Sequence, residues 1–350
     1  MTQKENKIFV NARFVTQPLT GVQRYAFECC MQMKSENSNI VFLCPKKIQQ
    51  HEWAMALGTV SIGINEGHIW EQIDLPFFLK NKKDYLLFNP CNTAPLSITR
   101  NLITIHDLSF LLYKDNHSFT FSLWYNYLLP RIAKRAKHIF TVSETVKNQI
   151  LNHYECNTNN ISITYNGMAE HLLHHKNMAT KEKIILTVGS ISKRKNIETL
   201  INAFIESDEL KEYTLIIIGQ QLPVFKTTSL NKHAKIIYKH KVSESDLIKD
   251  YQKAEIFVSL SHYEGFGIPI LEALNNNCKI LCSDIPIYHE LFQEYVYFCD
   301  HNNSQAVSNA IIKIIQDKNS KPCDKNILNS KYSYSRSGKH ILKTIDQLFK

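Results

Sequence analysis

The chain has 350 residues, of which 44% are hydrophobic and 21% are charged, and it carries 41 Lys and Arg against 32 Asp and Glu. This length exceeds one usual hydrophobic core and predicts two α/β domains in a folded protein of ordinary composition. The dispersed net charge of +9 favours anionic ligands such as nucleotides and acidic phospholipid headgroups, although a solvated basic surface explains the same balance. Nucleic acid is not expected as a partner, because the chain has no motif of a known nucleic-acid reader.

Short β-branched or aromatic runs alternate with longer helical patterns, which is typical of parallel α/β architecture. In the N-terminal half, strands are predicted at residues 7–11, 40–44, 85–88, 102–106 and 138–142. Helices are predicted at residues 21–33 and 118–137.

A domain boundary is predicted at the Tyr165-Asn166-Gly167 turn, where the pattern restarts. It separates a Rossmann-like domain at residues 1–167 from a second at 168–331, with a cleft between them. In the second domain, strands are predicted at residues 183–188, 214–218, 235–238, 256–260, 279–282 and 296–298. Residues 332–350 form an amphipathic helix that needs an apolar partner, which docking on the N-terminal domain would supply.

The most informative segment is IFVSLSHYEGFGIPILEALNNNCKILCSD, in which a buried strand leads into a glycine-rich loop and a helix opened by Pro269. Gly265 and Gly267 would let the loop backbone approach a ligand closely. The amides of Phe266, Gly267 and Ile268 would form an anion site at the helix N-terminus.

Two carboxylates flank this anion site at an eight-residue spacing, Glu264 on the loop and Glu272 in the first turn of the helix. A carboxylate only accepts hydrogen bonds, so the pair suits the hydroxyls of a sugar or a ribose. In the alternative, Glu264 is an exposed surface residue and Glu272 merely interacts with the helix dipole. The neighbouring glycines and proline favour the ligand site.

A second segment, IILTVGSISKRKNIETLINAF, ends a strand at Val188 and places Asn196 as the cap of the next helix. The carboxyl end of a parallel strand is where open α/β sheets bind ligands, so cations there could neutralise a diphosphate. A solvated basic loop is the alternative. The residues of this loop are Ser190, Ser192, Lys193, Arg194 and Lys195.

Two segments of the N-terminal half also lie at strand ends. His106 and Asp107 end the strand at 102–106, but a lone strand-end histidine is more often structural than catalytic. Gly21 and Arg24 begin the helix after the first strand, and one glycine there does not make a G-x-G-x-x-G fingerprint. Ser143 is predicted to cap the helix after the strand at 138–142.

Other signals are absent from the sequence. The first residues lack the basic-then-apolar layout of a secretory leader, and no run approaches about 18 apolar residues, so a cytoplasmic protein is expected. Nine cysteines without a C-x-x-C pair favour neither a disulfide framework nor a zinc site, and five of them are expected in the core: Cys29, Cys30, Cys44, Cys278 and Cys282. Without a D-x-D motif or a P-loop, no metal or other cofactor is expected.

Taken together, these segments resemble retaining glycosyltransferases of the GT-B fold, family four. EGFGIPILE resembles the E-x7-E motif of that family, and VGSISKRKNIETLINAF its diphosphate-binding loop. The resemblance extends over most of the chain through TGVQRYA, TIHDLSFL, FTVSETVKNQI, ITYNGM, LCSDIPIYHEL and YSYSRSGKHILKTI, the last being similar to the crossover helix. It implies a GT-B fold of two Rossmann-like domains facing across a cleft.

The resemblance assigns roles in the C-terminal half. Glu264 would hold the donor sugar and Glu272 the ribose, while Arg194 and Lys195 would bind the diphosphate together with Ser190 and the amides of residues 265–268. The base would lie near Gly219 and Val242. Ser190 stands where the family often has Arg, and Asn277 where a glycine is common.

In the N-terminal half, the resemblance implies that His106, followed by Asp107, approaches the donor sugar. Gly21, Arg24 and Asp107 would lie near the phosphates and the acceptor, although relatives often have two glycines in the first loop. The new bond would keep the donor's anomeric configuration through same-face attack without a protein nucleophile.

The function implied is transfer from a nucleotide-diphosphate sugar, with GDP-mannose favoured over UDP- or dTDP-sugars, to a saccharide or lipid-linked saccharide acceptor. The segments TGVQRYA and IHDLSFL resemble those of enzymes that build bacterial surface polysaccharides, which favours O-antigen or capsule as the product. The alternatives are a catalytically silent sugar-nucleotide-binding subunit, which the intact Glu264, Glu272, Lys195 and His106 disfavour, and a GT-B epimerase or phosphorylase.

Peripheral contact with the inner face of the cytoplasmic membrane is predicted for the helix at 118–137. Aromatic residues beside a basic cluster suit an interface of headgroups and acyl chains, whereas the alternative is a core helix with a solvated basic end. The residues concerned are Phe119, Phe121, Trp124, Tyr127, Arg131, Lys134, Arg135 and Lys137.

Overall fold

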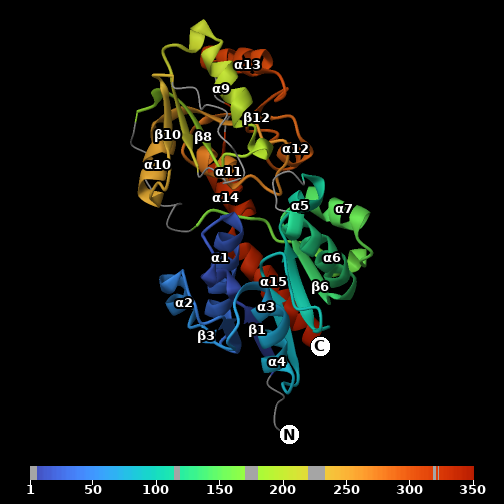
Figure 1. The fold of residues 1–350 in the computed structure, drawn as a ribbon. Coiled ribbons are helices and arrows are strands. Elements are labelled where there is room, and N and C mark those ends of the chain that lie inside the picture. The colour runs from blue at the N-terminus through green and yellow to red at the C-terminus, as the bar shows by residue number, and fades with distance from the viewer. Residues whose placement is uncertain (1–5, 114–118, 170–179, 220–232, 318–320, 322) are drawn as a thin grey trace. The chain divides into compact units, whose positions relative to one another are not determined.

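The computed structural model describes residues 6–113, 119–169, 180–219, 233–317, 321 and 323–350. The chain divides into two compact units, each built on one parallel sheet (Figure 1). The N-terminal unit comprises Met1–Leu112, Phe119–Ala169 and Ser330–Lys350, and the C-terminal unit comprises Tyr113–Ser118 and Glu170–Asn329. Within the described ranges, no helix combines the length and the apolar composition that crossing a bilayer requires.

The N-terminal unit has a seven-stranded sheet in the order β3-β2-β1-β4-β5-β6-β7. Its strands are β1 (Lys7–Asn11), β2 (Ile40–Cys44), β3 (Val60–Ser61), β4 (Tyr85–Asn89), β5 (Asn101–Ile105), β6 (His138–Thr141) and β7 (Ile161–Ile163). Its helices are α1 (Gly21–Glu36), α2 (His51–Leu57), α3 (Gly67–Ile69), α4 (Leu75–Leu79), α5 (Ser109–Leu112), α6 (Phe119–Arg135), α7 (Glu144–His153) and α15 (Tyr334–Phe349), with a π-helical turn, η2 (Trp70–Asp74), joining α3 to α4.

The C-terminal unit has a six-stranded sheet in the order β10-β9-β8-β11-β12-β13. Its strands are β8 (Glu182–Val188), β9 (Thr214–Ile218), β10 (Ile236–Lys239), β11 (Ala254–Ser259), β12 (Lys279–Ser283) and β13 (Tyr297–Cys299). Its helices are α9 (Ile197–Ile205), α10 (Glu244–Lys253), α11 (Ile268–Asn275), α12 (Pro286–Phe292) and α13 (Ser304–Gln316), and α14 (Lys325–Lys331) spans the boundary between the two units.

Every strand expected from the apolar runs is present within two residues of its predicted bounds, because strands buried on both faces are apolar throughout. The sequence analysis missed β3 and β7. Both are very short, and the two residues of β3 are exposed, so neither carries the apolar run by which the other strands were recognised. The nine cysteines are free, and the five expected in the core are buried, as predicted.

Each sheet contains one point where the strand order reverses. In the N-terminal unit, β1 lies between β2 and β4, and in the C-terminal unit β8 lies between β9 and β11. Successive crossovers leave from opposite sides of β1 and of β8, which opens a crevice at the carboxyl ends of the central strands. Open α/β sheets bind their ligands at such switch points.

The last helix, α15, packs along α1 of the N-terminal unit, as the sequence predicted (Figure 1). Ile341 and Ile345 are fully buried in this contact, whereas Leu348, expected on the same side, is 39% exposed near the chain end. The two helices approach closely at Gly338, where an added Cβ would lie 2.8 Å from Cβ of Gln32 and 2.9 Å from the carbonyl oxygen of Cys29.

Gly338→Leu is therefore expected to lower the stability of the N-terminal unit by about 1–3 kcal/mol, because a larger side chain forces α15 away from α1. The measurement is urea unfolding followed by a probe in that unit. Ser335→Leu, at an exposed position of the same helix, is the control and should change the midpoint little. A Gly338→Leu variant as stable as the control would contradict the close packing.

Candidate functional site

The switch point of the C-terminal unit carries a carboxylate held by two cations. Glu264 follows β11, and Arg194 and Lys195 lie in the short turn after β8. Arg194 Nη1 is 3.0 Å from Glu264 Oε2, Lys195 Nζ donates to Oε1, and Ser261 Oγ donates to Oε1 at 2.7 Å. The structure thus brings together three of the residues predicted to act on the donor.

Glu264 is ionised in this environment. Burial by itself would raise its pKa, but the charges of Lys195 and Arg194, with hydrogen bonds from Lys195 and Ser261, outweigh burial and lower the pKa to about 2. A permanently charged carboxylate accepts hydrogen bonds and donates none, which suits it to binding hydroxyl groups.

Two backbone hydrogen bonds fasten the same two loops. Arg194 Nη1 donates to the carbonyl oxygen of Tyr263 at 2.7 Å, and the amide of His262 donates to the carbonyl oxygen of Arg194 at 2.8 Å. The loops after β8 and β11 are therefore held together by their backbones as well as by charge. Ser192 lies in the first of these loops, and its buried Oγ has no hydrogen-bond partner among the described residues.

Glu272 lies in α11, but it is the fifth residue of the helix rather than part of its first turn, so the predicted position is corrected. The helix begins at Ile268, and Pro269 is its second residue instead of its first. Glu272 Oε2 accepts a hydrogen bond of 2.8 Å from the hydroxyl of Tyr251, a fully buried residue of α10. Tyr251 was missed because nothing in the sequence pairs a core tyrosine with a helix 21 residues later.

Two glycines at the carboxyl edge of this sheet lie where close packing leaves no room for a side chain. Gly267 precedes α11 with φ of +104°, and a Cβ there would lie 2.9 Å from the ring of Tyr288. Gly219, predicted to lie near the base, follows β9, where a Cβ would come within 1.8 Å of the carbonyl oxygen of Gly189. A side chain at Gly219 would force the backbone to move, and one at Gly267 would displace the ring of Tyr288 and strain a positive φ.

Three further residues of this unit were predicted to have a role, and the structure shows their positions. Asn196 stands before α9, but its side chain does not cap the helix; its Nδ2 donates to the carbonyl oxygen of His301 at 2.6 Å and its Oδ1 accepts from Thr199. The left-handed conformation of Asn196, with φ of +51°, accompanies this difference. Ser190 and Val242 are half-buried at the carboxyl ends of β8 and β10.

In the N-terminal unit, His106 is buried at the end of β5, and its ring lies edge-on to Tyr25 with centroids 4.7 Å apart. Burial lowers the pKa of His106 to about 4, although its hydrogen bond with Pro90 and the charge of Asp107 oppose this. The imidazole is therefore neutral at pH 7. Because Nε2 lies 2.8 Å from the carbonyl oxygen of Pro90, which can only accept, Nε2 carries the proton.

The first loop of this unit begins α1. Gly21 is exposed, and Thr20 caps the helix by accepting a hydrogen bond from the amide of Val22 at 3.3 Å. Arg24 lies over the ring of Trp53 at 5.4 Å. Asp107 accepts a hydrogen bond from the amide of Ser109, and Ser143 caps α7, as predicted.

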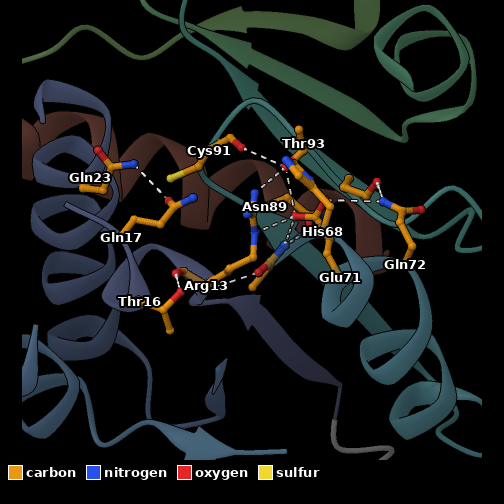
Figure 2. A network of polar contacts seen from close by, with 12 residues as sticks. Arg13, Thr16, Gln17, Gln23, His68, Glu71, Gln72, Asn89, Cys91 and Thr93 are labelled. Carbon is orange, nitrogen blue, oxygen red and sulfur yellow. Dashed lines mark hydrogen bonds and ion pairs between the residues drawn. The ribbon is translucent and has the colours of Figure 1, made fainter. Parts of the chain in front are cut away.

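A second buried carboxylate, missed by the sequence analysis, lies at the switch point of the N-terminal sheet (Figure 2). Glu71 of η2 is 1% exposed, and its Oε2 lies 3.3 Å from Arg13 Nε and accepts hydrogen bonds of 2.9 Å from Asn11 and from Thr93. Asn11 also donates to Asn89, so the last residues of β1 and β4 are both part of the network.

Glu71 is the electrostatic counterpart of Glu264. Burial alone would raise its pKa, but Arg13, His68 and Asn11 lower it to about 2. His68 Nδ1 lies 3.6 Å from Glu71 Oε1. Glu71 also lies in a π-helical turn, a distortion found frequently at functional sites.

The predicted membrane helix, α6, buries Tyr125, Leu128 and Ile132 in the core and exposes Leu123 and Tyr127. Its basic residues are exposed, but two of them are engaged: Arg131 lies 3.8 Å from the ring centroid of Tyr127, and Lys134 pairs with Glu155 at 2.6 Å. Among the described residues, no group of three or more His, Cys, Asp or Glu side chains is placed to hold a metal ion.

The lowered pKa of Glu264 predicts a pH-dependent contribution to stability. The carboxylate stabilises the fold fully above its unfolded pKa, near 4.5, and the stabilisation is lost as the pH falls through that value toward 2. Glu264→Gln should therefore cost on the order of 3 kcal/mol at pH 6, with the cost shrinking below pH 4.5. Urea unfolding of both proteins across this range measures it, with the exposed Glu198→Gln as control. A cost that does not vary with pH would contradict the lowered pKa of Glu264.

Comparisons with known proteins bear on the family of the chain. Residues 169–331 match the family model described as "Glycosyl transferases group 1". The chain is 34% identical over 246 residues to the O-antigen chain mannosyltransferase RfbU of Salmonella typhimurium, covering 67% of this chain and 66% of the relative. It is 26% identical over 260 residues to the O-antigen chain mannosyltransferase B of Escherichia coli, covering 68% and 67%. The chain thus spans about two thirds of the length of these relatives.

Among solved structures, the fold is similar to that of Anabaena Alr3699/HepE in complex with UDP and glucose, with a TM-score of 0.74 over 97% of this chain and 99% of the other. The two sequences are only 14% identical, so this likeness shows the GT-B fold and nothing finer. With the family model and the mannosyltransferase relatives, it shows that the chain belongs to the glycosyl transferases group 1, as a GT-B member similar to bacterial polysaccharide mannosyltransferases.

Proposed function

We propose that the chain transfers a sugar from a nucleotide-diphosphate donor to a saccharide acceptor during synthesis of a bacterial surface polysaccharide. The observation that carries the proposal is the ionised Glu264 clamped by Arg194 and Lys195 at the switch point of the C-terminal sheet. The printed activity of the two mannosyltransferase relatives supports the reaction class.

Arg194 and Lys195 are suited to bind the diphosphate of the donor and to stabilise the charge that develops on it as the bond to the sugar breaks. They are already fixed by Glu264 and by backbone contacts, so they need little reorganisation when that charge appears. The Glu264 carboxylate accepts hydrogen bonds from hydroxyl groups of the sugar, and Glu272 accepts them from those of the ribose. Transfer with retention by same-face attack, without a protein nucleophile, is part of this proposal.

GDP-mannose is the donor we favour, because both relatives named above are mannosyltransferases. The likeness to a structure that holds UDP and glucose keeps UDP-sugars next. The acceptor proposed is a saccharide or lipid-linked saccharide. A panel of GDP-, UDP- and dTDP-sugars screened by thermal stabilisation tests the donor, since a ligand that binds only the native state raises the midpoint.

A catalytically silent sugar-nucleotide-binding subunit is the alternative. Donor hydrolysis or transfer to a saccharide acceptor separates the two, because a silent subunit would be stabilised by the donor and would release no nucleotide. Release of the epimerised sugar, or of a sugar phosphate in the presence of phosphate, would instead identify an epimerase or a phosphorylase.

Glu272→Ala is expected to weaken nucleotide affinity by about 1.5–3 kcal/mol without unfolding the chain, through loss of a charged hydrogen-bonding group. Tyr251→Phe should weaken it less, by about 1 kcal/mol, because it removes only the hydroxyl that orients Glu272. Isothermal titration with the nucleoside diphosphate measures both, with the exposed Glu198→Ala as control. Unchanged affinity in a folded Glu272→Ala variant would remove the ribose role.

Transfer is expected to continue without divalent metal, because Lys193, Arg194 and Lys195 supply the positive charge on the diphosphate loop. The measurement is nucleotide release in excess EDTA, with and without added magnesium or manganese. Activity that disappears in EDTA and returns with either metal would contradict the proposal.

A further inference from the structure

The helical segment that joins β3 to β4 in the N-terminal unit exposes a row of large apolar side chains. It runs without interruption from Gly67 to Leu79 through α3, η2 and α4. Ile69, Ile73 and Phe77 are 59%, 58% and 79% exposed. Residues four apart lie on one side of a helix, so the three form a continuous row, which we name the apolar stripe.

The core does not explain this stripe. The opposite side of the segment supplies the core contacts, because Trp70, Leu75 and Leu79 are buried in a cluster with residues of β1, β2 and β4. A helix on a soluble surface normally places polar residues opposite its buried side. Single exposed apolar residues need no explanation, but a contiguous group marks an interaction surface.

The loop before the segment widens the stripe. Ile64 is 85% exposed, and its amide donates to Asp74 Oδ2 at 2.8 Å, which holds the loop beside the helix. Asn65 donates to the same carboxylate through its amide and its side chain, each at 2.8 Å. The one acidic side chain next to Ile73 is therefore engaged by the loop.

A cluster of positive charges lies at the end of the stripe. The segment 75–84 ends in three lysines and one acid, Asp84, and the lysines are exposed. The amino ends of neighbouring parallel strands share one edge of a sheet, and the amide of Lys7 in β1 donates to the carbonyl oxygen of Asp84 at 3.2 Å. Arg100 directly precedes β5, the next strand of the sheet. We call this set the basic edge: Lys7, Lys80, Lys82, Lys83 and Arg100.

We propose that the apolar stripe and the basic edge together bind the surface of an anionic lipid bilayer. The side chains of the stripe would enter the boundary between headgroups and acyl chains, while the cations contact lipid phosphates. A second copy of this chain would bring two basic edges together, so charge complementarity favours the bilayer. This surface differs from the predicted one on α6 in its row of three exposed apolar side chains; cations of both surfaces lie over aromatic rings, Lys82 over Phe78 at 5.2 Å and Arg131 over Tyr127 at 3.8 Å.

The test is co-sedimentation of the full chain with vesicles of phosphatidylcholine alone and of phosphatidylcholine with phosphatidylglycerol. The chain should bind the anionic vesicles, and less at high salt. The triple variant K80Q/K82Q/K83Q should lower the partition coefficient about 100-fold, since each lysine near an anionic surface contributes about fivefold. I69S/I73S/F77S should abolish binding. These side chains are exposed, so the thermal midpoints of both variants should stay close to that of the natural chain.

The matched control is L123S/Y127S, which removes the exposed apolar residues of α6 and should leave vesicle binding unchanged. The proposal is overturned if the natural chain does not bind anionic vesicles, or if the stripe and lysine variants bind them as well as the natural chain does. It is equally overturned if only the α6 variant loses binding. It is also overturned if the stripe variant converts a dimer to a monomer in sedimentation and leaves lipid binding intact. No donor or acceptor is present, so the result is independent of the proposed transfer reaction.

Discussion

The ion pairs of Glu264 with Arg194 and Lys195 are the interaction on which the C-terminal site depends. β8 and β11 are neighbours in the sheet, but the crossovers that follow them run to opposite sides. The loops after these two strands are therefore held together by side-chain and backbone contacts such as the Arg194–Glu264 ion pair. Burying a carboxylate without partners costs several kcal/mol. Removing one partner of a buried ion pair has this effect, because it leaves an uncompensated charge. The same charges that stabilise the loops are thus placed where an anionic ligand would bind.

The N-terminal unit repeats this arrangement with different residues. Arg13 follows β1 as Arg194 follows β8, and each guanidinium neutralises a buried carboxylate whose pKa is about 2. The two carboxylates differ in how they are held. Glu264 lies on a loop after a strand, whereas Glu71 lies within a helical segment and accepts a hydrogen bond from Asn11 at the end of β1, which also donates to Asn89 at the end of β4. A switch point leaves a crevice lined by backbone groups and polar side chains that need hydrogen-bond partners. A carboxylate paired with a cation supplies such partners.

The fold, and the meeting of Glu264 with Arg194 and Lys195 at one sheet edge, could be predicted because their signals are local. Apolar runs marked the strands, and Glu264, Gly267 and Arg194 stand in short segments next to strand ends. Features that depend on tertiary contacts could not be predicted. Asn196 has the residue type of a helix cap, yet its side chain bonds to His301, more than 100 residues away. Likewise, the pairing of Arg13 with Glu71 joins a strand end to a distant helix, and neither residue stands in a recognisable motif.

The exposed face of the segment 67–79 also could not be predicted from the sequence, because burial depends on tertiary contacts. The aromatic and basic residues of α6 gave the stronger sequence pattern, but packing uses much of its apolar side, and Tyr127 and Glu155 engage two of its cations. The segment 67–79 has a weaker pattern, because both of its faces are apolar and only the structure shows which one is buried. Its first turns carry Glu71 at the carboxyl edge of the sheet, and its last residue precedes the lysines of the amino edge. Thirteen helical residues span about 20 Å, so most of the length of this segment separates the polar network at its first turns from the lysines that follow it, while the apolar stripe runs along its exposed side.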